Sequence, residues 1–282
     1  MRHFFTALLL GIPLLACGAA DPAPSMAVPV AIAIGSGRLV AIPPVPVDGA
    51  RVAPHPLPGR LRLPPGPGLH AVVIVLHGCG GVGTNQTAWA ERLLGWGYGS
   101  LVLDSLTPRR IDTVCAHTRQ ALVTRQDRAG DVIAAARWLA RQPAVNPKRI
   151  GVLGGSHGGA AAETVTLEPF AKQADGLIRA AVDYYGACRN PEQYGNIPLL
   201  ALAGEADTWR DPAQVCRQFA AAVGTTRDVT VVTYPNAVHA FDNPRLRERR
   251  TVEGHPLQYD PVAAADSYAR VHAFLDRTLG PG

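Results

Sequence analysis

The sequence predicts a doubly wound α/β domain, in which helices cover both faces of a mostly parallel sheet. From residue 70 onward, apolar runs of strand length alternate with segments of helical periodicity, which is the order that builds such sheets. The runs are apolar throughout, as strands buried on both faces are. At 282 residues and 47% hydrophobic, the chain suits one large domain.

Six runs are the expected strands, and each is stopped by Gly, Pro, Ser or another polar residue. In chain order they are "HAVVIVLHG", "SLVLDS", "RIGVLGGS", "AAVDYYG", "IPLLALAG" and "VTVVTYP". Helices are expected over residues 86–96, 126–142, 160–170, Pro212–Val223 and Pro261–Leu279. Only residues 186–196 separate the fourth strand from the fifth, so we expect no large lid domain.

Residues 1–20 are expected to be a signal peptide, because a basic start precedes a short apolar run that ends in small residues. The run closes on "LLAC", which resembles the bacterial lipobox, so we expect Cys17 to be acylated and to anchor the protein to a membrane. Ordinary cleavage before Asp21 is the alternative and would give an unanchored form. Either way the protein is predicted to be exported, to the bacterial periplasm or as a membrane-anchored lipoprotein.

Residues 21–50 are expected to form a proline-rich tether with edge strands, because proline removes backbone donors and disfavours helix. Short strand-like pieces occur at residues 28–34 and at Arg38–Ile42. The α/β domain is then expected to run from residue 51 to residue 282.

The basic balance does not indicate a nucleic-acid partner. The net charge is +5, yet Lys148 and Lys172 are the only lysines among the 27 basic residues, which suggests a compositional bias towards arginine. The densest basic run, "RLRERR" at residues 245–250, is interpreted as a solvated loop.

Four cysteines remain after export, an even number in an oxidising compartment, so disulfides are expected. Their number alone leaves three pairings open. None of them has the spacing of metal ligands, so no metal site is expected.

The stretch "GGSHG" at residues 154–158 matches G-x-S-x-G between a strand and a helix, the context of a nucleophile elbow. The glycines allow the tight approach of strand and helix, and the strained turn holds the hydroxyl of Ser156 in a cleft. A strand-to-helix turn with a serine cap is the simpler alternative.

A serine nucleophile needs a base, and the base needs an orienting acid. In this arrangement the acid follows a later strand and the histidine follows the last one. Asp207 and His239 occupy those places, just past the ends of two expected strands. The competing acids are Glu205, Asp211 and Asp242, and the competing bases are His157 and His255.

"HGCGG" at residues 77–81 follows the first expected strand of the domain. A glycine-lined loop there can present a backbone N–H to an anionic intermediate. We expect the N–H groups of Cys79 and His157 to form this oxyanion hole. A plain glycine turn is the alternative.

From about residue 70 the chain resembles the α/β-hydrolase superfamily, and within it the dienelactone hydrolase-like family. The stretches "LHGCGG", "DSLTPR", "GVLGGSHGG", "LAGEADTW" and "HAF" carry the resemblance, in that family's order and spacing. It implies a triad of Ser156, Asp207 and His239, no cofactor, and hydrolysis of esters or lactones. Dienelactone hydrolases proper use a Cys nucleophile and a Glu in the oxyanion loop, whereas this chain has Ser156 and no acid at residues 77–81. A serine esterase is therefore expected.

A second motif competes with this reading. Residues 78–83 match G-x-G-x-x-G, and Asp104 lies where a dinucleotide fold keeps its ribose-binding acid. This would indicate an NAD-binding oxidoreductase. It leaves the alignment of Ser156, Asp207 and His239 unexplained, and an exported protein meets little NAD.

With the strands placed, the cysteines follow strands that are expected to be neighbours. We predict the disulfides Cys79–Cys115 and Cys188–Cys216, both in loops beside the cleft. Trp209 and a tyrosine at a strand end, Tyr184 or its neighbour Tyr185, are candidates for lining the pocket.

Two further functions remain open from the sequence. A serine peptidase of the prolyl oligopeptidase type would use the same triad, although that family usually carries a large extra domain. A non-catalytic surface lipoprotein could keep the fold for binding.

Overall fold

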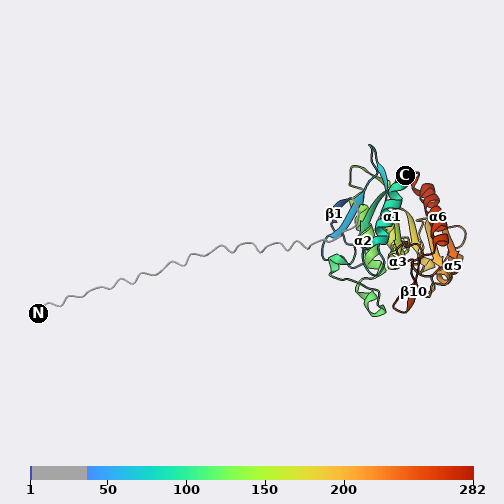
Figure 1. Ribbon diagram of the computed structural model, residues 1–282. Coiled ribbons are helices and arrows are strands. Elements are labelled where there is room, and N and C mark those ends of the chain that lie inside the picture. Colours follow the sequence, from blue (N-terminus) through green and yellow to red (C-terminus); the bar gives the residue numbers. More distant parts are fainter. Residues whose placement is uncertain (2–36) are drawn as a thin grey trace. The chain divides into compact units, whose positions relative to one another are not determined.

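The computed structural model describes Met1 and residues 37–282 (Figure 1). In this part of the chain, eight strands form one sheet in the order β1-β2-β4-β3-β5-β6-β7-β8, and two more form a hairpin. Helices cover both faces of the sheet, which confirms the predicted fold class. The strand predicted at residues 28–34, the signal segment and Cys17 lie outside the described residues.

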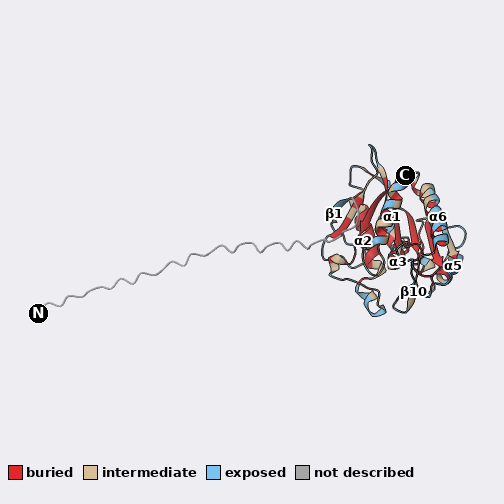
Figure 2. Cartoon of the chain, in the orientation of Figure 1, coloured by how far each residue is buried: buried red, intermediate tan, exposed pale blue. Residues whose placement is uncertain are grey.

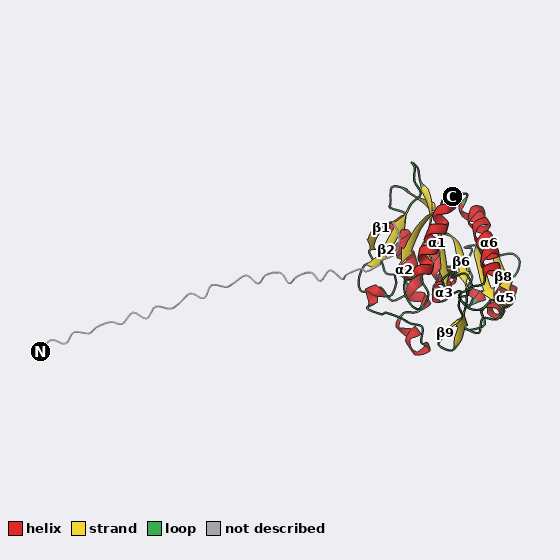
Figure 3. Ribbon diagram, in the orientation of Figure 1, coloured by secondary structure: helices red, strands yellow, loops and turns green. Residues whose placement is uncertain are grey.

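The strands of the main sheet are β1 Arg38–Ile42, β2 Leu57–Arg62, β3 His70–Leu76, β4 Gly99–Leu103, β5 Val145–Gly155, β6 Ile178–Tyr184, β7 Leu199–Gly204 and β8 Val229–Tyr234. The hairpin consists of β9 Arg250–Val252 and β10 His255–Leu257. The α-helices are α1 Thr84–Gly95, α2 Arg125–Leu139, α3 His157–Thr164, α4 Glu168–Ala174, α5 Pro212–Val223 and α6 Pro261–Leu279. Short 3₁₀ helices, η1 Thr107–Arg109, η2 His117–Leu122 and η3 Pro191–Gln193, occur in the loops (Figure 3).

The pairing of the strands decides where the loops meet. β3 to β8 run parallel, while β1 and β2 are antiparallel additions at one edge. β3 lies between β4 and β5, so the chain first winds one way from β3 and then returns to its other side. Such a switch in winding direction opens a crevice at the carboxyl ends of the strands. The loops after β3 and β5 leave the sheet side by side at this point, since Leu76 pairs with Gly154.

Two apolar layers hold the helices against the sheet (Figure 2). Alternate residues of β3 face opposite sides, as the pleat requires. Val73 and Val75 belong to the layer that includes side chains of α1 and α6, and Val72 and Ile74 belong to the layer that includes side chains of α2, α3, α4 and α5. Both faces are therefore covered, which explains why the parallel strands are apolar throughout.

The structure differs from the sequence-based expectation in three places. The helix expected over residues 160–170 is two helices, because α3 ends at Thr164 and Pro169, in the first turn of α4, cannot continue a preceding helix. β2, which lies among prolines, and the hairpin β9–β10 were not expected. The strand expected at Arg38–Ile42 is present as β1, and it forms the edge of the main sheet beside β2. In the described part of the chain, no helix combines the length and hydropathy needed to cross a bilayer.

Candidate active site

Ser156 occupies the sharp turn between β5 and α3. Its backbone has φ 56° and ψ −122°, a conformation that L-residues rarely adopt. The turn is held on both sides, because the Ser156 N–H donates to the carbonyl of Tyr184 at 2.8 Å and the Ser156 carbonyl accepts from the N–H of Ala160 at 2.9 Å. The hydroxyl-bearing residue is thus fixed at the carboxyl edge of the sheet.

Two glycines permit this turn. A Cβ on Gly158 would lie 2.5 Å from the carbonyl oxygen of His77, and one on Gly154 would lie 2.3 Å from the carbonyl carbon of Gly158. Both contacts involve backbone atoms, so any side chain would force the strands and α3 apart. The amide N–H of His157 is the first of α3 and has no acceptor within the helix.

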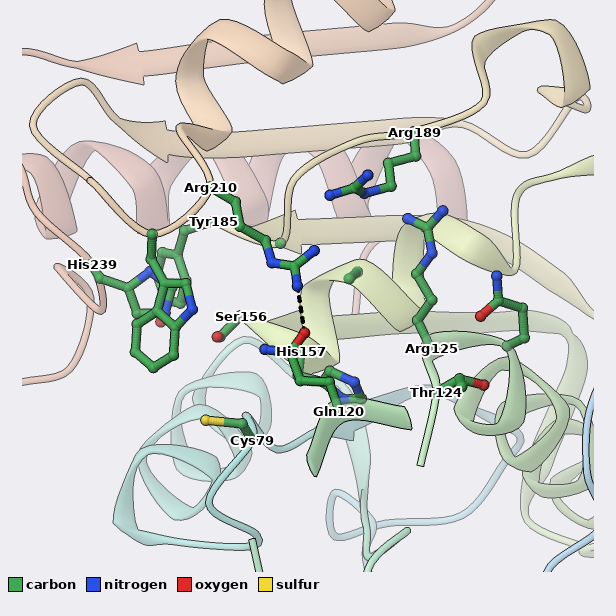
Figure 4. Close-up of a pocket in the computed structure, with 14 residues that line it drawn as sticks. Cys79, Gln120, Thr124, Arg125, Ser156, His157, Tyr185, Arg189, Arg210 and His239 are labelled. Carbon is green, nitrogen blue, oxygen red and sulfur yellow. Dashed lines mark hydrogen bonds between the residues drawn. The ribbon is translucent and has the colours of Figure 1, made fainter. Parts of the chain in front are cut away.

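Asp207 and His239 form a buried hydrogen-bonded pair beside this turn. Nδ1 of His239 lies 2.7 Å from Oδ2 of Asp207, and the other carboxylate oxygen accepts from the backbone N–H of Trp209 at 2.8 Å. With Nδ1 engaged by the acid, Nε2 is left for a proton transfer. Figure 4 shows the side chains of Ser156 and His239 directed into the same pocket.

The competing acids have other partners. Asp242 is buried and accepts from the indole N–H of Trp89 at 2.7 Å and from the hydroxyl of Tyr185. Glu205 is exposed and pairs with Arg217, and Asp211 caps α5. None of these arrangements brings a carboxylate to His239.

The competing bases, His157 and His255, also have other partners. The imidazole of His157 is hydrogen-bonded to Arg128, and its pKa lies well below the ordinary value because of burial and that positive charge. His255 stacks on Trp209, with ring centroids 5.0 Å apart, and its Nδ1 contacts the hydroxyl of Thr208.

The loop after β3 is fixed by side chains as well as by backbone bonds. The buried ring of His77 accepts from the N–H of Ser105 at Nε2 (3.2 Å) and donates from Nδ1 to the carbonyl of Gly78 (2.6 Å). Burial, together with the charge of Arg128, holds the pKa of His77 well below its ordinary value, so the ring is neutral. Cys79 follows in this loop, and its carbonyl accepts from the N–H of Val114 at 2.9 Å.

The structure contains both expected disulfides, Cys79–Cys115 and Cys188–Cys216. The first ties the loop after β3 to the loop after β4. The second ties the loop after β6 to α5, so Cys216 lies in a helix and not in a loop as expected. Asp183 and the two sulfurs of Cys188 and Cys216 are the one metal-like ligand group among the described residues. Sulfurs bonded to each other are not thiolates, so this group does not form a metal site.

Asp104 does not act as the acid of a dinucleotide fold. It is buried, and its carboxylate accepts from the N–H groups of Leu106 and Thr107 and from the Thr107 hydroxyl. It closes the turn that opens η1 and has no free face for a ribose.

A pocket with a volume of about 190 Å³ opens above Ser156 (Figure 4). Its lining includes Ser156, His239, Cys79 and Trp209. The prediction that Tyr184 lines it is wrong. Tyr184 is the last residue of β6, and it points into the core and bonds to Ser267, whereas its neighbour Tyr185 lines the pocket.

Three arginines that the sequence analysis missed also line the pocket. Arg125, Arg189 and Arg210 come from the start of α2 and from the loops after β6 and β7, and Figure 4 shows their guanidinium groups gathered on one side. The carboxylate that pairs with Arg125 is Glu163, 3.4 Å away, whose pKa burial raises to about 8. At neutral pH this side of the pocket is therefore strongly positive. A signal was available for Arg189 and Arg210, because both lie in loops that follow the carboxyl ends of strands, β6 and β7.

Residues 57–279 match the family model of the dienelactone hydrolase family. The chain therefore belongs to the dienelactone hydrolase family, a group within the α/β-hydrolase fold. This confirms the resemblance drawn from the sequence.

Solved structures show the same fold at low identity. A dienelactone hydrolase from Anabaena variabilis is 20% identical, with a TM-score of 0.60, and the likeness covers 86% of this chain and 99% of that one. A dienelactone hydrolase-like promiscuous phosphotriesterase from metagenomic libraries is 20% identical, with a TM-score of 0.64 over 87% and 99% of the two chains. An esterase from Thermogutta terrifontis is 17% identical, with a TM-score of 0.60 over 87% and 94%.

Two curated proteins of Mycobacterium tuberculosis, from strains H37Rv and CDC 1551, also match. Both carry the provisional name of phosphoribosyl transferase and are 27% identical to this chain over 225 residues. The match covers 76% of this chain and 46% of each relative, so the chain spans about half the length of these proteins.

Proposed function

We propose that the protein is a serine hydrolase that cleaves carboxylic esters or lactones through an acyl-enzyme. Ser156 is the nucleophile, His239 the general base and Asp207 the acid that orients it. The observation that carries the proposal is the strained turn of Ser156 beside the buried pair of Asp207 and His239, in one pocket.

The reaction proceeds in two steps. Nε2 of His239 takes the proton from Ser156 as Oγ attacks the ester carbonyl, and the N–H groups of Cys79 and His157 donate to the resulting oxyanion. His239 then gives the proton to the leaving alcohol. A water molecule, activated by the same histidine, hydrolyses the acyl-enzyme and releases the acid.

The pocket favours a small or medium substrate that carries a negative charge. It is lined by Trp209 and Tyr185 on one side of the nucleophile and by three guanidinium groups on another. Arginine binds carboxylate and phosphate groups through paired N–H donors. An ester whose acyl or alcohol part ends in such a group would place its carbonyl at Ser156 and its charge at the arginines.

The test is turnover of a small ester and lactone panel by wild type and by Ser156→Ala. We expect the alanine variant to lose all turnover and all labelling by a fluorophosphonate. Ser100→Ala is the matched control, since the Ser100 hydroxyl is buried in β4 and, among the described groups, has no partner. Retained turnover in Ser156→Ala would refute the serine mechanism.

The same panel separates the alternative functions. Cleavage of peptides without cleavage of p-nitrophenyl esters would indicate a serine peptidase instead. A wild-type protein that takes up no fluorophosphonate would indicate a non-catalytic binding protein.

The proposed location is outside the cytoplasm, with an acyl chain on Cys17. The support is the leader-like sequence and two disulfides, which persist in oxidising compartments. Labelling of cells with an alkyne fatty acid should mark wild type and not Cys17→Ser. Equal labelling of both would exclude acylation at this residue.

A further inference from the structure

Arg128 is a charged side chain in the interior of the domain. It lies on α2 and is 0% exposed. Burial lowers its pKa to about 10, which still leaves the guanidinium positively charged at neutral pH. A buried charge is costly unless the fold uses its hydrogen bonds, so the partners of this guanidinium are informative.

The partners of Arg128 are not carboxylates. Nη2 donates to the carbonyl oxygen of His77 at 2.7 Å, and Nη1 contacts Nδ1 of His157 at 3.0 Å. The nearest acids are engaged elsewhere: Asp131 pairs with Arg109 at 2.8 Å, and Asp104 closes its own turn. Because the imidazole of His157 is neutral, its Nδ1 is the acceptor in this contact.

The two partners belong to the two segments that carry the proposed oxyanion donors. His77 directly follows β3 and stands two residues before Cys79, while His157 directly follows Ser156. The segments also touch each other, since the His77 carbonyl lies against Gly158. One planar guanidinium therefore contacts both segments that carry the proposed oxyanion donors.

We propose that Arg128 is a positioning residue that sets the separation and direction of the Cys79 and His157 N–H groups. This inference rests on the proposed serine mechanism. Arg128 itself touches neither the pocket nor a reacting atom. The rigid fork of arginine fixes two acceptors at once, which the single ammonium of a lysine does not. An oxyanion donor that is lost costs roughly 10²–10³-fold in kcat, so a partial misalignment should cost about 10–100-fold.

Arg128→Lys keeps the charge and removes the fork. We expect its kcat on a neutral p-nitrophenyl ester to fall about 10–100-fold with KM within about 3-fold of wild type. Inhibition by a trifluoromethyl ketone, which forms an oxyanion on the serine, should weaken by a similar factor. If the role of Arg128 were merely structural, the variant would have a lower melting temperature, but kcat and ketone inhibition would not fall together.

Arg137→Lys is the matched control. Arg137 lies on the same helix and also donates to a backbone carbonyl, that of Gln173 at 2.8 Å, but it is remote from the pocket. We expect it to lose some thermal stability and to keep the wild-type kcat.

A second variant covers the case in which Arg128→Lys fails to fold. His157→Phe removes the Nδ1 acceptor and retains the backbone N–H, and we expect a smaller loss of kcat, about 3–10-fold. Normal kcat and normal ketone inhibition in both folded variants, or in His157→Phe alone if the lysine variant is unfolded, would overturn the proposal. Failure of the serine mechanism itself would show separately, as turnover by Ser156→Ala.

Discussion

The carboxylate of Asp207 is held at both oxygens, by Nδ1 of His239 at 2.7 Å and by the backbone N–H of Trp209 at 2.8 Å. Both side chains of the pair are buried. The imidazole thus has one orientation available, with its second nitrogen facing the pocket. This pair lies 32 positions apart in the chain and meets because β7 and β8 are adjacent parallel strands.

Asp207→Asn tests the pair. The amide can donate to the imidazole and so favour the wrong tautomer, and we expect kcat to fall roughly 10³–10⁴-fold. The melting temperature should change little, because the side chain keeps its shape. Glu205→Gln, at an exposed acid of the same loop, is the control and should keep the wild-type kcat. Equal activity in the two variants would assign the orienting role to another acid.

The disulfide Cys79–Cys115 should matter for both stability and rate. It closes a loop with a sequence separation of 36, for which chain entropy gives about 4 kcal/mol. Cys115→Ser should lower the free energy of unfolding by about that amount and reduce kcat, because Cys79 carries a proposed oxyanion donor.

Cys216→Ser is the comparison for this effect. It opens the other disulfide, with a separation of 28, which does not hold the oxyanion loop. We expect a similar decrease in the free energy of unfolding, measured in urea, and a smaller decrease in kcat. If the two variants lost kcat equally, the loop after β3 would have no special dependence on its disulfide.

The arginines of the pocket should favour substrates that carry a negative charge. Arg189→Gln and Arg210→Gln are each expected to raise KM about 10-fold for p-nitrophenyl hydrogen glutarate, equivalent to roughly 1.4 kcal/mol of binding. KM for p-nitrophenyl valerate should stay within about 2-fold. Arg245→Gln makes the same change in net charge at a residue outside this pocket. An equal response to both esters would argue against charge recognition.

Glu163 should make stability depend on pH. Burial raises its pKa from 4.5 to about 8, so between these values the folded chain holds a proton that the unfolded chain releases. The free energy of unfolding must therefore fall as pH rises through this window, by up to about 1.4 kcal/mol per unit. Glu163→Gln removes this contribution, so its stability relative to wild type should increase from pH 5 to pH 8.

Urea titrations at several pH values measure this difference. Glu168→Gln provides the contrast, because this exposed carboxyl pairs with Lys172 and its pKa is lowered in the folded protein. Its stability relative to wild type should not increase over the same range. A constant difference between Glu163→Gln and wild type would show that Glu163 is ionised throughout.

The parallel strands could be predicted because their signal is local. Each is a continuous apolar run stopped by a polar or flexible residue. The placement of Ser156, Asp207 and His239 followed from that, since each stands just past a strand end. Likewise the cysteines could be paired once neighbouring strands were known.

Other features depended on details that a run of residues does not reveal. Tyr184 is the last residue of β6 and points into the core, whereas Tyr185 follows the strand with φ 46° and lines the pocket, a turn that the apolar run does not reveal. β2 was not predicted, because it lies among prolines, which disfavour a strand assignment. The burial of Arg128 could have been predicted, because it stands four residues before Val132, in line with the buried face of α2. An arginine on an apolar stripe was a sign of an internal partner.

The indole of Trp209 lies between two imidazoles, with ring centroids 4.9 Å from His239 and 5.0 Å from His255. Of the four tryptophans, it is the one that lines the pocket. Its emission should consequently respond to occupancy and to the charge of its neighbours, and the difference between wild type and Trp209→Phe would isolate that response. The fold thus supplies an optical reporter at the site, which lets ligand arrival be followed in real time without an attached dye.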